Sequence, residues 1–97
     1  MATYVTLARY THAGIQSVKE GPSRLERARQ IGSSMGATIK DFYLTMGRYD
    51  MVVVIEAPDD ATVARMLLAI GSAGAITTET LRAFPEREYR EIIAALP

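Results

Sequence analysis

Gly47-Arg48-Tyr49-Asp50 separates two strand-like runs, 39–46 and 51–57. A connection this short that carries glycine and aspartate is typical of the turn of a β-hairpin. Turn geometry alone does not call for an arginine followed by a tyrosine. We therefore expect the tip to be a contact point, with Arg48, Tyr49 and Asp50 as candidate ligand-binding residues. For Gly47 and Asp50, a purely structural role in the turn is the stronger interpretation.

Strand patterns also lie outside this hairpin. Residues 3–9 alternate between two sets of side chains, which predicts a strand with two different faces. The second arm of the hairpin is apolar on both faces, as central strands usually are. Residues 76–84, rich in threonine, form the last predicted strand.

Helix signals fall between the strands. Thr11 can cap a short helical turn, and Ser23 and Glu26 have the spacing of a capping box that opens a second helix. Gly36 is placed to end that helix in a left-handed conformation. The segment 58–60 opens a further helix, whose body is apolar and belongs to the core.

The C-terminal segment predicts a last helix that begins at Pro85 and Glu86. Its apolar residues recur at helical spacing, namely Tyr89, Ile92, Ile93 and Leu96.

These elements predict an α+β, ferredoxin-like βαββαβ fold with a C-terminal helix, in one domain over residues 1–97. Right-handed crossovers place the first two helices on one face of a four-stranded antiparallel sheet. The other face stays uncovered. We expect it to carry a mixture of aromatic and polar residues that meets a partner or lines a pocket: Tyr4, Thr6, Tyr43, Thr78 and Arg82.

Composition narrows the class of partner. Eleven basic residues balance eleven acidic ones, so no net field attracts nucleic acid or an anionic membrane. The basic residues of 19–29 are interleaved with glutamates, which is typical of a solvated helix face. No segment is long and apolar enough for a membrane span, and we expect no signal peptide, because residues 1–3 lead straight into the strand pattern. The lack of cysteine fits a reducing cytoplasm, where we expect the protein to act.

Several motifs at matching spacing resemble the small GYD domain family. They are the Gly-x-Tyr-Asp tip at Gly47, Tyr49 and Asp50, and the segments 4–10, 41–43, 56–60 and 78–84. The resemblance covers nearly the whole chain. It implies a relative of the dimeric α/β-barrel proteins, in which two ferredoxin-like sheets pack through their uncovered faces. A homodimer or higher homo-oligomer is therefore expected.

The resemblance does not imply a reaction, because the function of the family is unassigned. The broader fold hosts cofactor-free monooxygenases, haem-handling enzymes, isomerases and transcriptional sensors, so the fold does not select among activities. We expect no cofactor.

His12 and Tyr43 are the candidate catalytic residues. The single histidine lies just after a helix cap, where it can serve as a general base or be an ordinary exposed residue. No cluster of metal-ligating residues accompanies it, so no metal site is expected. Tyr4, Tyr43 and Arg82 can form a ligand wall, or an interface in which tyrosine and arginine are enriched.

Three functions follow. The first is an oligomeric soluble module that binds a small ligand or a protein partner. The second is a small cofactor-independent enzyme, monooxygenase-like or isomerase-like, with a cleft between sheet and helices. The third is a purely structural assembly protein.

Overall fold

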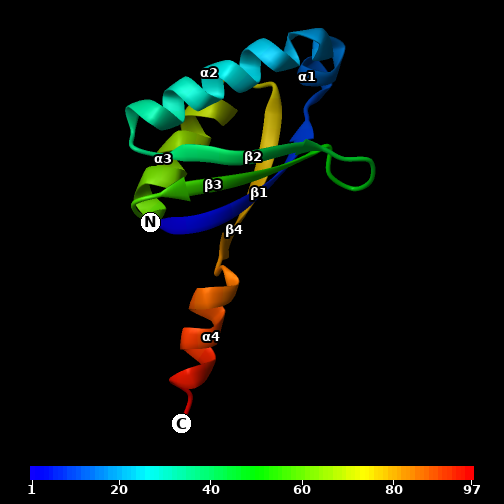
Figure 1. Cartoon of the computed structure of the whole chain (residues 1–97). Helices are drawn as coiled ribbons and strands as arrows, with labels where there is room; N and C mark the ends of the chain where they lie inside the picture. Colours follow the sequence, from blue (N-terminus) through cyan, green and yellow to red (C-terminus); the bar gives the residue numbers. More distant parts are fainter.

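Four strands form one antiparallel sheet in the computed structural model, which describes residues 1–97 (Figure 1). The strands lie in the order β2-β3-β1-β4, and their bounds are β1 Ala2–Tyr10, β2 Thr38–Leu44, β3 Met51–Ala57 and β4 Ile76–Ala83. This order, with a helical crossover before β2 and another before β4, confirms the ferredoxin-like α+β fold.

The helices pack on one face of the sheet, except for the last. Their bounds are α1 His12–Gln16, the 3₁₀ turn Val18–Glu20, α2 Gly21–Ser34, α3 Asp60–Gly71 and α4 Glu86–Ala94. α2 and α3 contact each other above the sheet, whereas α4 projects away from it and lengthens the molecule to 51 Å (Figure 1). None of these helices is long and apolar enough to cross a membrane.

Two helix starts are fixed by side-chain caps. The Thr11 hydroxyl accepts a hydrogen bond from the amide of Gly14 at 3.0 Å, which confirms the predicted cap of α1. A Cβ at Gly14 would lie 1.9 Å from the carbonyl oxygen of Ala75, so only glycine permits this close approach. At α3, an Asp59 carboxylate oxygen accepts from the Thr62 amide at 2.8 Å.

The predicted capping box at Ser23 and Glu26 is wrong. α2 begins at Gly21, two residues earlier, and the Ser23 hydroxyl donates to the Glu20 carbonyl at 2.8 Å. Pro22 lies in the first turn, where its missing amide costs nothing. The helix therefore begins with proline rather than with a serine cap. The prediction for Gly36 is confirmed, since its φ of 82° is left-handed.

On β1, the residues expected on the uncovered face lie on the helix-covered face, and the reverse. Tyr4, Thr6 and Ala8 are all buried beneath the helices, with exposed fractions of 3%, 2% and 2%. Val5 and Leu7, which alternate with them, lie on the uncovered face and are only partly buried. The strand register assigns the residues of the other strands to the same two faces, because each residue shares its face with its cross-strand partner.

The expected composition of the uncovered face is therefore wrong for four of its five residues. Arg82 pairs with Tyr4 and Thr78 pairs with Ala8, so both lie on the helix-covered side with Tyr4 and Thr6. Only Tyr43, opposite Val52, lies on the uncovered face. Alternation identifies the two sets, but it does not say which set meets the helices.

A β-bulge decides the faces of β2. Ile39 pairs with Ile55 and Asp41 pairs with Val54, so Lys40 is the extra residue. After the bulge, Phe42 returns to the side of Ile39. Unbroken alternation would have put these two apolar residues on opposite faces, and the bulge brings both under the helices.

A single hydrophobic core lies between the sheet and the helices. Its two largest fully buried side chains are Ile55 of β3 and Met66 of α3. The remaining buried members come from β1, β2, β3, the segment before β2, and α3: Tyr4, Ala37, Ile39, Ala57 and Val63. The core therefore depends on the covered face alone and takes nothing from the opposite face.

Candidate functional site

The hairpin tip, residues 45–50, is bonded back onto β1. The Asp50 carboxylate accepts from the Tyr10 amide at 2.9 Å, and the Asp50 amide donates to the Ala8 carbonyl at 2.9 Å. The Thr45 hydroxyl donates to the Tyr49 carbonyl at 2.7 Å. Gly47 has a φ of 151°, which a larger residue rarely adopts. Gly47 and Asp50 thus hold the turn in place.

Tyr49 reaches from the tip to the uncovered face. Its hydroxyl donates to a Glu79 carboxylate oxygen at 2.7 Å, and the Arg9 guanidinium lies 5.0 Å from the centre of its ring. The bond to Glu79 raises the pKa of the Tyr49 phenol above its usual value. Arg48 is exposed and makes no hydrogen bond or ion pair within the chain. That Arg48 and Tyr49 contact a ligand stays a prediction.

Tyr4 occupies the core rather than an open surface. Its hydroxyl donates to a carboxylate oxygen of Asp60 at the start of α3. Burial, reinforced by this bond, raises the pKa of Tyr4 to about 12. The cation of Arg82 lies 5.6 Å from the Tyr4 ring and 4.4 Å from the Phe84 ring. Tyr4 therefore connects the covered face to α3, and Arg82 packs against Tyr4 and Phe84. Glu79 lies on the opposite face from Arg82, as expected.

The two catalytic candidates do not meet. His12 is exposed at the first position of α1, and Tyr43 is 57% exposed on the uncovered face. Neither lines the main cavity of the molecule. No hydrogen bond joins either side chain to another group of the chain.

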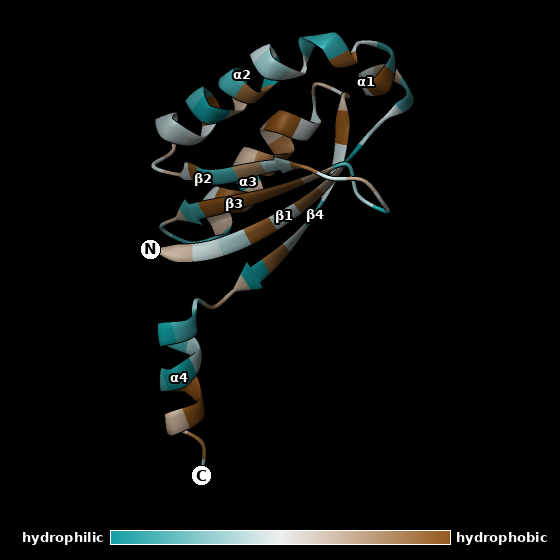
Figure 2. Ribbon diagram, turned by 45° about the vertical axis from the view of Figure 1, so that its right-hand side comes forward, coloured by the Kyte–Doolittle hydropathy of each residue, from teal (hydrophilic) through white to brown (hydrophobic).

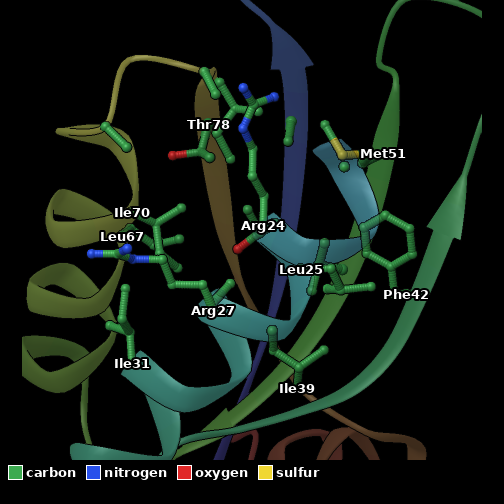
Figure 3. A pocket seen from close by; sticks show the side chains of 18 of the residues that line it. Arg24, Leu25, Arg27, Ile31, Ile39, Phe42, Met51, Leu67, Ile70 and Thr78 are labelled. Carbon is green, nitrogen blue, oxygen red and sulfur yellow. The ribbon is translucent and has the colours of Figure 1, made fainter. Parts of the chain in front are cut away.

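The main cavity, of about 600 Å³, lies between α2, α3 and the covered face (Figure 3). Hydrophobic residues make up 19 of the 26 that line it. Phe42 and Met51 lie on the strand side, and Leu67 and Ile70 on α3 (Figure 3). Of the ligand-binding candidates predicted from the sequence, none lines this cavity.

Arg24 and Arg27 of α2 are the charged residues of this lining, which contains no aspartate or glutamate. The Arg24 guanidinium donates to the Ser17 hydroxyl at 2.6 Å and is 3.4 Å from Glu20. Arg27 has no hydrogen bond or ion pair, and in Figure 3 it extends beside Leu67. The sequence predicts both arginines as part of a solvated helix face. Their spacing of three residues, which puts both on one side of a helix, was the available signal.

The uncovered face has an aliphatic centre. One row crosses three strands through Val54, Val5 and Leu81, and the next row begins with Val52 and Leu7. Leu81 is 47% exposed. In Figure 2, β3 is brown along most of its length and β1 alternates between brown and pale. Charged side chains follow the margins, including Arg9 and Glu79 at one end and the pair Lys40–Glu56 at the other.

α4 presents a second exposed apolar surface. Tyr89, Ile92 and Ile93 are between 45% and 57% exposed, and Leu96, just past the end of the helix, is 62% exposed. The spacing of Tyr89, Ile92 and Ile93 puts them along one side of the helix, which follows β4 after two residues and projects from the body (Figures 1 and 2). The Arg82–Glu88 ion pair, at 3.9 Å, connects α4 to the sheet.

Comparison with known proteins places residues 4–93 in agreement with the family model of the GYD domain. A protein of Thermus thermophilus named glutamine synthetase and cystathionine beta-lyase binding protein is 36% identical over 86 residues, which cover 88% of this chain and 90% of that protein. Two crystal structures share the fold. TTHA0845 from Thermus thermophilus matches with a TM-score of 0.57 and 22% identity over 88% of this chain and 95% of its own. The second, the crystal structure of FFRP-DM1, matches with a TM-score of 0.60 and 21% identity over 87% of this chain and 100% of its own.

Proposed function

Because the chain belongs to the GYD domain family, we propose that it is a self-associating, non-catalytic module that binds other proteins. The observation that carries this proposal is the aliphatic centre of the uncovered face. Val5, Val54 and Leu81 form a continuous row with charged residues only at its margins. An apolar centre with a polar rim is the usual anatomy of a protein interface.

A second copy of the chain is the occupant that we assign to this face. Two such sheets can pack face to face about a twofold axis, so that each copy presents the same aliphatic patch to the other. Tyr43 lies beside Val52 at the edge of the patch and would be partly buried by the contact. The assembly would be a dimeric α/β barrel.

We assign contact with other proteins to α4. Its apolar residues Tyr89, Ile92 and Ile93 lie at i, i+3 and i+4, the spacing by which a helix fits a hydrophobic groove. The relative from Thermus thermophilus is named for binding glutamine synthetase and cystathionine beta-lyase. We propose the same two enzymes as the first partners to test here. The cysteine-free chain fits the reducing cytoplasm, where these contacts would form.

Calorimetric titration of the purified assembly into purified glutamine synthetase and cystathionine beta-lyase tests this proposal. The two enzymes should come from the same source as this chain, with an unrelated enzyme of similar size as the control. We expect saturable binding to at least one of the two. Ile93→Gln should weaken it about tenfold, whereas Glu91→Gln on the polar side of α4 should not. If neither enzyme binds, the assignment of these partners is wrong.

The cavity favours the second candidate, a small cofactor-independent enzyme, because a reaction needs an enclosed site. His12 and Tyr43 would not serve there, since both lie outside the cavity. The hydroxyl-bearing residues of the lining, such as Tyr10 and Thr78, would be the groups to test. If a substrate is found, Tyr10→Phe should reduce kcat without changing the melting temperature. An unchanged kcat would remove Tyr10 from the reaction.

A further inference from the structure

The cavity beneath α2 and α3 combines an apolar floor with cations at its margin. Its volume of about 600 Å³ is within the range of pockets that bury a small organic ligand. Val53 of the sheet and Leu67 and Ile70 of α3 are partly exposed and supply aliphatic surface, with the buried core residues Ile39 and Ile55 beneath them. The floor therefore suits a hydrocarbon or aromatic body rather than a sugar or a nucleotide, which need many polar partners.

Charge defines the other end of the ligand. The lining contains two arginines and no carboxylate, although the chain as a whole has equal numbers of both charges. Ser17 and Glu20 already hold Arg24. Arg27 has no partner within the chain, and its guanidinium is available as a planar fork for two oxygens.

We propose that this cavity binds an apolar carboxylic acid. The hydrocarbon or aromatic body lies on the floor between the sheet and α3, and the carboxylate accepts hydrogen bonds from Arg27. Arg24 adds a second positive charge nearby, while its bonds to Ser17 and Glu20 keep it in place. This site is on the opposite side of the sheet from the proposed self-contact, so it can be tested independently of the proposed function.

Titration calorimetry with three ten-carbon probes below their micelle concentrations tests the charge preference. The probes are decanoate, decanol and decyltrimethylammonium, and the flat acid 2-naphthoate serves as a second carboxylate. We expect one acid per chain, with decanol binding about tenfold more weakly and the cation more weakly still. Arg27→Gln should reduce decanoate binding to the level of decanol. Arg87→Gln removes the same charge from α4 and should change nothing.

Two further variants locate the binding. Ala28→Phe places a ring in the cavity from α2 and should abolish binding while the melting temperature shows that the protein still folds. Leu81→Thr on the uncovered face should leave decanoate binding unchanged. The inference is overturned if neither acid binds, if decanoate and decanol bind equally, if Arg27→Gln binds like the wild type, or if Leu81→Thr rather than Ala28→Phe removes binding. If Ala28→Phe does not fold, the inference is tested by Arg27→Gln alone: this variant should bind decanoate no more tightly than decanol.

Discussion

The face of the sheet beneath α2 and α3 and the face on the opposite side carry different kinds of side chain. Hydroxyl groups point under the helices from Tyr4, Thr6 and Thr80, and the last two lie 2.8 Å apart. Aliphatic side chains occupy the centre of the open face. On β1 alone, the opposite arrangement would bury Val5 and Leu7 in place of Thr6 and Ala8, and so more apolar surface. This pattern is what we expect if the open face is covered by a second copy of the chain, as proposed, and the covered face keeps polar atoms because they have hydrogen-bond partners.

The two faces should differ most in the loss of stability that substitution causes at two neighbouring residues of β3. Ile55 is 1% exposed in the core, and Val54 lies on the open face. Ile55→Ala should lower the free energy of unfolding by about 3 kcal/mol, because it leaves a cavity among packed neighbours. Val54→Ala should cost roughly half as much, and its cost should grow with protein concentration because the dimer contact is what it weakens.

Urea denaturation at two protein concentrations about a hundredfold apart measures both effects. Equal costs for Ile55→Ala and Val54→Ala at both concentrations would mean that the two faces are equivalent in the folded protein, contrary to this account.

A smaller effect is expected on the pH dependence of stability, where two tyrosines on opposite faces should behave differently. The pKa of Tyr4 is raised to about 12, because burial and the bond to Asp60 favour its neutral form. This stabilisation is fully present below pH 10, where the unfolded phenol begins to ionise, and is lost as the pH rises towards 12. Tyr4→Phe should flatten the loss of stability across that interval. Tyr43→Phe should leave it unchanged.

Thermal denaturation from about pH 8 to pH 12 checks this pair. A wild-type curve that is already flat between pH 10 and pH 12, or one flattened as much by Tyr43→Phe, would show that Tyr4 is not the group responsible.

The smallest effects on stability should come from the hairpin tip, where Asp50 bonds to β1 and Tyr49 bonds to Glu79 on the uncovered face. Asp50→Ala removes the bond to the Tyr10 amide and should cost about 1 kcal/mol of unfolding free energy. Tyr49→Phe removes only an exposed bond to Glu79 and should cost a few tenths of a kcal/mol. Urea denaturation measures both. A larger loss for Tyr49→Phe than for Asp50→Ala would reverse the roles assigned to the two residues.

The order of elements was predictable from the sequence because turn residues and apolar periodicity are local signals. Thr11, Asp59 and Gly36 act where their residue types indicate. The faces of β1 were not predictable in the same way. Tyr4 is buried because its hydroxyl reaches Asp60, 56 positions later, and alternation contains no information about such a partner.

The candidate site was harder still to predict. The cavity depends on which side of β1 meets the helices and on the bulge at Lys40, which returns Phe42 to the side of Ile39. Neither feature has a local signature in this chain. The sequence around Arg27 predicts one more charge on a solvated helix, because nothing there indicates an apolar floor beneath it.

We propose that the aliphatic face of the sheet is an interface between two copies of the chain. Light scattering at micromolar concentration measures the molar mass of the wild type, Val54→Lys and Ser33→Lys, and so reports whether this contact forms. We expect a dimer for the wild type and for Ser33→Lys, whose substitution lies on the exposed side of α2. We expect a monomer for Val54→Lys, because the lysine would bring a long charged side chain into the apolar contact between the two copies. A monomeric wild type, or a Val54→Lys variant that stays dimeric, would contradict this proposal.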